Sequence, residues 1–340
     1  MRSIMYSRTG DSSVLSLVDR EPAAPGVDEV RVRILVSGVN PTDWKTRADG
    51  TLAFAEVVPN QDGAGVIEEV GIGVDNLEPG DRVWLYLAAH QRPTGTAQEL
   101  TVVPARHVVR LPADVSYEVG ASLGVPAMTA HRALTVHEHG PAHLSPGALA
   151  GRTVLVQGGA GAVGHAAIQL AVWAGATVIA TVSSDAKAEL ARAAGAQNVL
   201  HYPDSALADR IHELAPHGIE HVVEVAPAQN AALDVAVLAN HGSIAYYANN
   251  NGDEFTAPIV ASFAKNARWQ GLLLYTVGEE ALQAAADDIT AALTDGALAV
   301  GEEAGLPLTW FPLEETAAAH DAVQRGTTGK VLIRVAEATA

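Results

Sequence analysis

The sequence predicts an α/β protein that combines a β-rich N-terminal domain with a doubly wound parallel sheet flanked by helices. Three observations support this fold class. Residues 1 to about 123 form short β-type segments separated by Gly- and Pro-containing turns. From residue 153 onward, strand-like and helical segments alternate, as in a parallel sheet with right-handed crossovers. A chain of 340 residues with 48% hydrophobic residues is long enough to bury two cores.

The N-terminal region has the periodicity of half-buried strands. Residues Val30–Val36 alternate apolar and charged side chains, as expected for a strand with one face in the core. Further strands are expected at Val57–Gln61, Val66–Val70, Gly80–Trp84, Thr101–Pro104 and His107–Leu111. This spacing indicates a compact β-rich unit.

The second region begins at Gly124, where the hydrophobic period changes. The expected strands are Thr153–Gln157, Thr177–Val182, Asn198–His201, His221–Val225, Ser243–Tyr247 and Trp269–Tyr275. The expected helices are Pro126–His139, Ala162–Ala174, Asp185–Ala194, Ala206–Leu214 and Asn230–Leu238. Such alternation predicts a single parallel sheet.

The C-terminal tail returns to a mixed pattern. It contains expected helices at Glu279–Thr294 and Leu313–Gln324 and expected strands at Thr309–Phe311 and Lys330–Val335. We expect this tail to rejoin the first domain. The predicted division is therefore residues 1–123 with 276–340, and residues 124–275.

Composition excludes several classes of function. The net charge is −18 without a Lys/Arg cluster, which argues against a nucleic-acid-binding surface. The chain shows no uninterrupted apolar run long enough to span a membrane and no apolar signal-peptide core at its start. It has no cysteine, so it has neither disulfides nor thiolate ligands, and this fits a reducing cytoplasm.

A glycine-rich turn joins the first strand of the second region to its helix. Residues 158–164 read Gly158-Gly159-Ala160-Gly161-Ala162-Val163-Gly164 and contain G-x-G-x-x-G. Between a strand and a helix, this motif predicts a dinucleotide site whose phosphates lie at the helix N-terminus. The alternative is a glycine-rich loop without a ligand.

The end of the next strand indicates which dinucleotide is bound. An NAD site usually has an acidic residue there, whereas this chain has Ser183 and Ser184 with Lys187 one turn into the helix. Hydroxyls and a cation suit the 2′-phosphate of NADPH. Asp185 is the competing candidate, either as a ribose ligand or as a helix cap.

Several separate motifs resemble the medium-chain dehydrogenase/reductase superfamily, and within it the zeta-crystallin-like quinone oxidoreductases. They are the glycine loop, Gly38-Val39-Asn40-Pro41, Asp62–Gly65, Gly80-Asp81-Arg82-Val83, Gly95-Thr96-Ala97-Gln98-Glu99, Gly124-Val125-Pro126 with Thr129-Ala130, and Gly329-Lys330. The resemblance implies a GroES-like catalytic domain, a Rossmann domain and an active site in the cleft between them.

The resemblance also implies a zinc-free site. Where zinc-dependent relatives have a Cys, a His and a Cys, this chain has Asn40, Gln61 and Val125. Valine cannot bind zinc, so polarisation of an alcohol by a metal is not expected. Hydride transfer from NADPH to an activated acceptor, a quinone or an α,β-unsaturated carbonyl, then becomes the expected reaction.

The resemblance assigns roles to individual positions. Asn40 is the expected substrate-side polar group, with Gln61 and Lys45 as further candidates. A tyrosine common in the group is replaced by Thr51, which leaves the proton donor open and solvent as an alternative. The expected cofactor-binding residues are Thr129, Gly158, Gly159, Ala160, Gly161, Ala162, Val163, Ser183, Ser184, Lys187, Tyr202, Ala226, Tyr246, Leu273, Arg325 and Lys330. For Tyr246 and Leu273, a purely structural core role is an equal alternative.

The apolar segment Trp269–Tyr275 is the expected last strand of the parallel sheet. An exposed apolar edge favours a homodimer, unless a helix covers it. The leading hypothesis is an NADPH-dependent quinone reductase. The alternatives are reduction of the C=C bond of enones, alkenals or enoyl thioesters, and an NADPH-binding protein without turnover.

Overall fold

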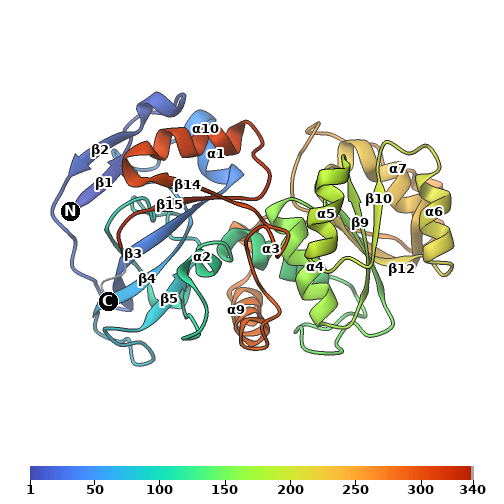
Figure 1. Cartoon of the computed structure of the whole chain (residues 1–340), viewed down its shortest axis with the longest axis horizontal. Helices are drawn as coiled ribbons and strands as arrows, with labels where there is room; N and C mark the ends of the chain where they lie inside the picture. The colour runs from blue at the N-terminus through green and yellow to red at the C-terminus, as the bar shows by residue number, and fades with distance from the viewer. Residues whose placement is uncertain (338–340) are drawn as a thin grey trace. The chain divides into compact units, whose positions relative to one another are not determined.

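The computed structural model describes residues 1–337 and divides the chain into two compact units (Figure 1). The first unit comprises Met1–Val125 and Pro307–Ala340, and the second comprises Pro126–Leu306. The tail thus rejoins the first unit later than expected, because residues 276–306 group with the second. Among the described residues, no helix is long and apolar enough to cross a membrane.

The first unit is built on a seven-stranded sheet. Its strand order is β14-β15-β3-β4-β5-β7, with β6 also paired to β3. The bounds are β3 Glu29–Val39, β4 Asp62–Val70, β5 Arg82–Leu85, β6 Leu100–Pro104, β7 Val108–Arg110, β14 Leu308–Pro312 and β15 Lys330–Arg334. Two short strands, β1 Arg2–Met5 and β2 Ser16–Asp19, form a separate antiparallel pair.

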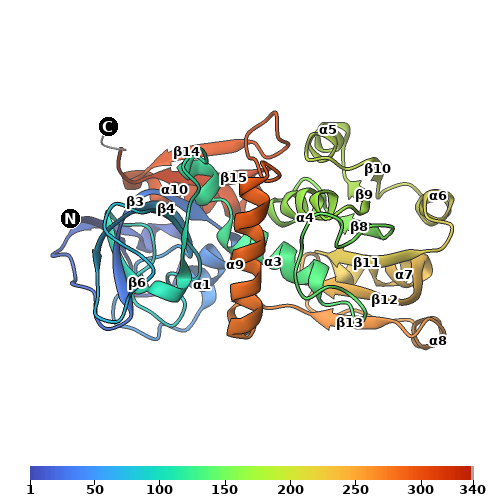
Figure 2. The same ribbon diagram turned by 90° about the horizontal axis from the view of Figure 1, so that it is seen from below.

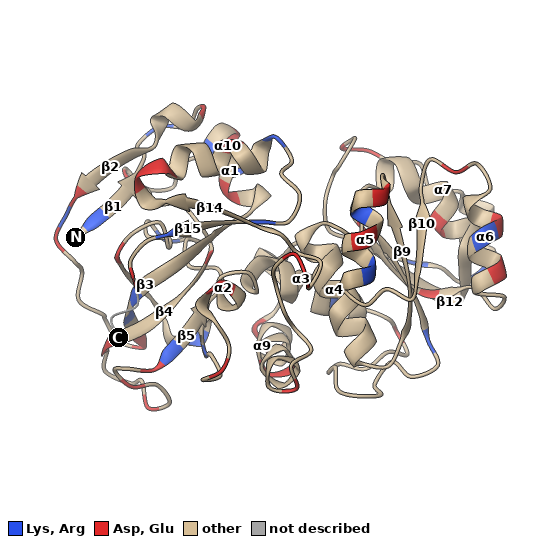
Figure 3. Cartoon of the chain, in the orientation of Figure 1, with Lys and Arg blue, Asp and Glu red and all other residues tan. Residues whose placement is uncertain are grey.

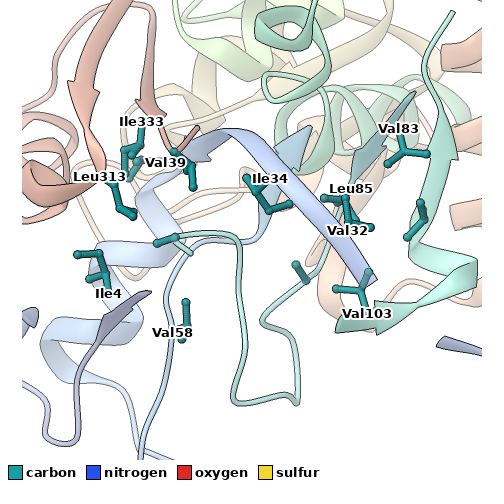
Figure 4. Packing of buried hydrophobic residues seen from close by; sticks show 14 of the residues in the cluster. Ile4, Val32, Ile34, Val39, Val58, Val83, Leu85, Val103, Leu313 and Ile333 are labelled. Carbon is teal, nitrogen blue, oxygen red and sulfur yellow. The ribbon is translucent and has the colours of Figure 1, made fainter. Parts of the chain in front are cut away.

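The core of this unit lies against β3. Ile34 of β3, Leu85 of β5 and Ile333 of β15 are fully buried in one apolar cluster (Figure 4). The first unit also contains the helices α1 Pro41–Asp49, α2 Tyr117–Gly120 and α10 Thr316–Gln324. The expected strand at Val57–Gln61 is instead a loop with isolated bridges, and helix α1 was not expected.

The second unit is the predicted doubly wound sheet. Its six strands are all parallel and have the order β10-β9-β8-β11-β12-β13. From β8 to β10 the chain adds strands towards one edge, and from β11 to β13 it adds them towards the other, so the topological switch point lies between β8 and β11. Helix α4 lies on one face and α6 and α7 on the other (Figures 1 and 2). The strands are β8 Thr153–Gln157, β9 Thr177–Val182, β10 Asn198–His201, β11 Ile219–Glu224, β12 Leu238–Tyr246 and β13 Arg268–Gly271. The helices are α3 Gly124–Thr135, α4 Ala162–Trp173, α5 Asp185–Ala193, α6 Leu207–Leu214, α7 Pro227–Val237, α8 Ile259–Ala264 and α9 Glu279–Thr294.

Contacts of α9 explain the shifted boundary. Asp288 accepts hydrogen bonds from His131 Nε2 of α3 at 2.7 Å and from the Leu144 backbone at 2.6 Å. Ile289 and Leu293 of the same helix are buried. The tail therefore contributes a full helix to the second unit before it returns to the first.

Candidate functional site

The glycine loop has the geometry of a phosphate cradle. Gly158 has a φ of 72°, a conformation that L-residues with side chains rarely adopt. A side chain on Gly164 would overlap the Gly158 carbonyl, so this glycine allows close packing of helix and loop. Gly161 is the N-cap of α4, and a Cβ there would meet only the Gly158 oxygen at 3.5 Å.

The first turn of α4 supplies the binding groups. In a helix that begins at Ala162, the first N–H groups have no partner four residues earlier. These N–H groups and the positive end of the helix dipole suit an anion. The loop residues Gly158–Val163 therefore stay the predicted pyrophosphate site.

Ser183, Ser184, Lys187 and Tyr202 gather at the ends of β9 and β10. Ser184 is the N-cap of α5, where its hydroxyl accepts from the Lys187 N–H at 3.4 Å. Tyr202 donates its N–H to the Val182 carbonyl at 3.1 Å, directly before Ser183, and its side chain is exposed. Helix α5 carries alternating acidic and basic positions (Figure 3).

The position of Asp185 separates the two sequence hypotheses about the cap. Ser184 caps the helix, and Asp185 is the first helical residue, with its carboxylate exposed and 3.4 Å from His201 Nε2. The residue at the tip of β9 is therefore a hydroxyl, and the nearest carboxylate points to solvent.

The expected nicotinamide-side residues lie on four different elements of the second unit. Thr129 is buried on α3, Ala226 is the N-cap of α7, and Tyr246 ends β12 with its ring 5.4 Å from that of Phe255. Leu273 follows β13 and is 56% exposed, which excludes the core role for this residue.

A buried polar network that sequence analysis did not identify lies beneath the glycine loop. Gln157 accepts from Thr181 Oγ1 at 2.5 Å and donates to Asp234 Oδ1 at 2.9 Å. Thr181 Oγ1 also accepts from the Gly158 N–H at 3.4 Å, and Glu224 Oε1 accepts from the Ala226 N–H. The loop and the start of α7 are thus linked. The missed signal was the position of Glu224 and Gln157 at the ends of adjacent strands.

Burial raises the pKa of Asp234 well above its ordinary range, and the neighbouring Glu224 adds to this effect. In the described residues, Glu224 Oε2 and Asp234 Oδ2 have no hydrogen-bond partner. Because two neighbouring buried carboxylates would repel each other, we infer that one of the two groups keeps its proton.

In the first unit, Asn40, Asp43, Asp62 and Lys330 form one buried group, here called the Lys330 cluster. Lys330 Nζ lies 2.7 Å from Asn40 Oδ1 and 3.3 Å from Asp62 Oδ2. Asn40 Nδ2 donates to Asp62 Oδ2 at 2.7 Å, and its backbone N–H donates to Asp43 Oδ2 at 2.7 Å. Asp62 Oδ1 accepts from the Val125 N–H at 2.9 Å.

The cluster contains two carboxyl groups and one ammonium. Burial raises the pKa of Asp43 to about 8, and the charge of Asp62 adds to the shift. Burial also raises the pKa of Asp62, but Lys330 and the hydrogen bonds oppose this. Burial lowers the pKa of Lys330, which Asp62 opposes. Asp62 has the ammonium and two further donors, so it is the ionised carboxylate.

Other expected site residues lie outside this cluster. Gln61 accepts from the Ala89 N–H at 3.1 Å and so holds a loop, while Lys45 is exposed on α1. Arg325 lines a depression of about 570 Å³ in the first unit with Asp11, Ser12, Ser13, Asp321 and Gln324. Lys330, expected at the cofactor, uses its ammonium on Asn40 and Asp62.

Two family models match most of this architecture. The "Alcohol dehydrogenase GroES-like domain" matches residues 26–113, and the "Zinc-binding dehydrogenase" model matches residues 162–291. Human quinone oxidoreductase is 28% identical over 98% of this chain and 97% of its own length. A mycobacterial protein solved with NADPH is 29% identical, with a TM-score of 0.81 over 98% of this chain and 99% of that chain.

This chain belongs to the quinone oxidoreductase family of the medium-chain dehydrogenase/reductase superfamily. Its fold is the GroES-like domain and Rossmann-type sheet that the sequence motifs imply. The enoyl reductase CurK superposes on this chain with a TM-score of 0.81, over 98% of this chain and 99% of CurK. Its sequence identity is only 22%, so this similarity supports the fold alone.

The residues at the superfamily's zinc position do not fit a zinc ion in this family member. Val125 has no side-chain donor atom, and the Asn40 oxygen accepts from an ammonium. Within residues 1–337, no three His, Cys, Asp or Glu side chains gather where they would hold a metal. A fixed ammonium therefore lies where the zinc-dependent relatives have their metal ligands.

Proposed function

We propose that this protein is a zinc-independent reductase that uses NADPH to reduce quinones. The observation that carries this proposal is the end-to-end similarity to quinone oxidoreductases, together with an intact glycine loop. When bound, NADPH supplies a hydride. A quinone that takes up this hydride and one proton becomes a hydroquinone.

The second unit supplies the groups that hold NADPH. The Ala162 and Val163 N–H groups would bind the pyrophosphate at the positive end of α4. Ser183, Lys187 and Tyr202 would hold the 2′-phosphate, because two hydroxyls and a cation stand where an NAD site has a carboxylate. Thr129, Ala226, Tyr246 and Leu273 remain our candidates for the nicotinamide side. Arg325 remains a candidate for the 2′-phosphate, and Lys330 remains a candidate cofactor-binding residue.

Asn40 is the group in the first unit that we assign to the acceptor. Its amide donates one hydrogen to Asp62 and keeps a second for an oxygen atom of the substrate. Such a bond strengthens as negative charge develops on that oxygen. Water would supply the proton, since Thr51 stands where related reductases have a tyrosine.

The test is a steady-state assay with NADPH and a simple quinone, compared with a short enone. We expect quinone reduction with a hydroquinone product. Selective formation of a saturated ketone would favour the C=C reductase, and tight NADPH binding without oxidation by any acceptor would favour a non-catalytic protein.

Cofactor preference gives a second test. Lys187→Ala should weaken NADPH binding about tenfold, because it removes one cation from the 2′-phosphate, and should leave NADH binding unchanged. Titration of the protein with each nucleotide, followed by nicotinamide fluorescence, measures both constants. Equal loss for NADH would mean that Lys187 has only a structural role.

We also propose a cytoplasmic homodimer formed through β13 and α8. Strand β13 is the last strand of its sheet, and Ile259, Val260 and Phe263 of α8 are 75%, 70% and 66% exposed. An apolar helix beside an open strand edge is typical of a self-association surface. Val260→Glu should yield a monomer in analytical ultracentrifugation, whereas Ile72→Glu, at an exposed site of the first unit, should not. A monomeric wild type would refute the dimer.

A further inference from the structure

The amide of Asn40 lies between a group that only donates and a group that accepts. Lys330 Nζ approaches Oδ1 at 2.7 Å, and Nδ2 approaches Asp62 Oδ2 at 2.7 Å. An ammonium has no lone pair, so the atom facing it must be the amide oxygen. The orientation of an asparagine amide is normally ambiguous, but here Lys330 and Asp62 together determine it.

The surrounding backbone makes room for this arrangement. A side chain on Gly38 of β3 would overlap the Ala121 carbonyl and lie 3.0 Å from Lys330 Cε. A side chain on Gly124 would overlap Asp62 Oδ1. Lys330 and Asp62 are 2% and 0% exposed, and Asn40 itself is 2% exposed, so all three side chains are shielded from bulk solvent. The cluster is therefore a closed frame around one amide.

The frame determines what Asn40 can offer a ligand. Its Oδ1 accepts from Lys330, and one Nδ2 hydrogen goes to Asp62. These two bonds leave the second Nδ2 hydrogen for another acceptor, while the amide oxygen already faces a donor. The arrangement therefore favours a ligand oxygen that accepts from Asn40.

We propose that Lys330 is a positioning residue that makes Asn40 a fixed N–H donor to a carbonyl oxygen of the acceptor. This inference rests on the proposed reductase function and deepens it, because it names the group of the substrate that is recognised. Without Lys330 the amide is held by Asp62 alone, and no donor fixes its oxygen. Loss of a donor at such a position typically lowers kcat about 10²–10³-fold.

The experiment is a double-mutant cycle of Lys330→Met and Asn40→Ala, measured as kcat and KM with a simple quinone and NADPH. If Lys330 acts through Asn40, Lys330→Met should lower kcat at least about tenfold in the wild type and little in the Asn40→Ala background. Lys330→Gln, which retains an N–H donor, should recover part of kcat. Additive effects of the two substitutions would overturn the proposal.

Controls separate this role from stability. Arg47→Met removes another fully buried cation of the first unit, whose guanidinium donates to the Gly10 carbonyl and Gln324, and should lower stability but not kcat. If Lys330→Met does not fold, the cycle is repeated in protein that also carries Asp62→Asn, which removes the uncompensated carboxylate. Additive effects on kcat in that protein would equally overturn the proposal.

Failure of the proposed function gives a different result. A wild type that reduces enones but not quinones leaves the Lys330 inference standing, since both substrates carry a carbonyl oxygen, and the cycle is then measured with the enone. A wild type that reduces no carbonyl-containing acceptor overturns both. An active wild type with additive variants overturns only the role of Lys330.

Discussion

Each unit contains a buried pair of neighbouring carboxyl groups, and the two pairs are compensated in different ways. In the first unit, Asp62 has the Lys330 ammonium at 3.3 Å. In the second, no cation among the described residues pairs with Glu224 or Asp234, and the proton that we infer on one of them takes its place beside the amide of Gln157. Both pairs are almost completely excluded from water.

The two pairs differ in whether the group that compensates the buried negative charge can dissociate. A lysine is covalently part of the chain, so its ammonium is held beside Asp62 and Asn40 by the fold. A shared proton is lost when the pH rises far enough, and two carboxylates then repel each other in a medium of low dielectric. The first arrangement suits a fixed substrate contact, and the second makes the base of the glycine loop sensitive to alkali.

Removing the cation should have the largest effect. Lys330→Met leaves the Asp62 carboxylate buried without its counter-charge, and breaking such a pair typically costs about 3–5 kcal/mol. Urea denaturation at pH 7 measures this loss. Lys330→Met together with Asp62→Asn should recover much of it, and a single variant as stable as the wild type would show that the ammonium is not what compensates Asp62.

Acid should affect histidines rather than either carboxyl pair. Burial lowers the pKa of His221 to about 3, so folding requires its neutral form. The stability it contributes is complete above the unfolded pKa near 6.5 and is lost as the pH falls towards 3, by about 2 kcal/mol at pH 5. His221→Gln, whose oxygen can still accept from Arg152, should flatten the unfolding free energy between pH 6.5 and 5. An unchanged slope would contradict this assignment.

A rise in pH should lower the free energy of unfolding through the Glu224–Asp234 pair, by a smaller amount than the preceding two changes. The pKa of Asp234 is higher in the folded state than its ordinary 3.8, so its contribution is complete below that value and declines as the pH rises towards the raised pKa. The limiting slope is about 1.4 kcal/mol per pH unit for one proton. Asp234→Asn, which carries a permanent N–H, should remove this decline.

Two measurements check the Asp234 prediction. In the wild type the free energy of unfolding should decline from about pH 4 upwards until the raised pKa of Asp234 is passed, and this decline should be absent in Asp234→Asn. NADPH affinity should show the same dependence on pH if the network supports the glycine loop. The matched control variant is Asp43→Asn, which replaces a buried carboxyl group of the first unit by an amide. If Asp234→Asn were less stable than the wild type throughout this range, the shared proton would be ruled out.

The sequence allowed prediction of those features that are local. The parallel sheet, the glycine loop and the hydroxyls after β9 follow from periodicity and short motifs, and the family comparison confirms the fold. Helix α1 was missed because its residues, PTDWKTRAD, lack an apolar stripe. Its start depends on a capping box between Asn40 and Asp43 and on Pro41 at the first helical position. The Asn–x–x–Asp spacing was a usable signal.

Features that depend on distant residues were not predictable. Lys330 and Asn40 are separated by 290 residues, so nothing near either one indicates that they are in contact. The segment Trp269–Tyr275 was expected as one strand, but the strand ends at Gly271, and a short helical turn at Leu274–Thr276 follows. Beyond the strand, Leu273 is 56% exposed whereas Leu274 is buried. The role of Asn40 itself stays a prediction.

The position of Lys330 near the end of the chain also bears on biosynthesis. Strands β14 and β15 complete the first sheet, yet the ribosome makes them after the whole of the second unit. At about 5–20 residues per second, the 268 residues between Asp62 and Lys330 take on the order of 10–50 s to synthesise. During that interval the nascent first unit has an open sheet edge beside β3 and an uncompensated carboxylate. Although it is translated first, this unit is completed last, so the emerging chain has its greatest need of chaperones there.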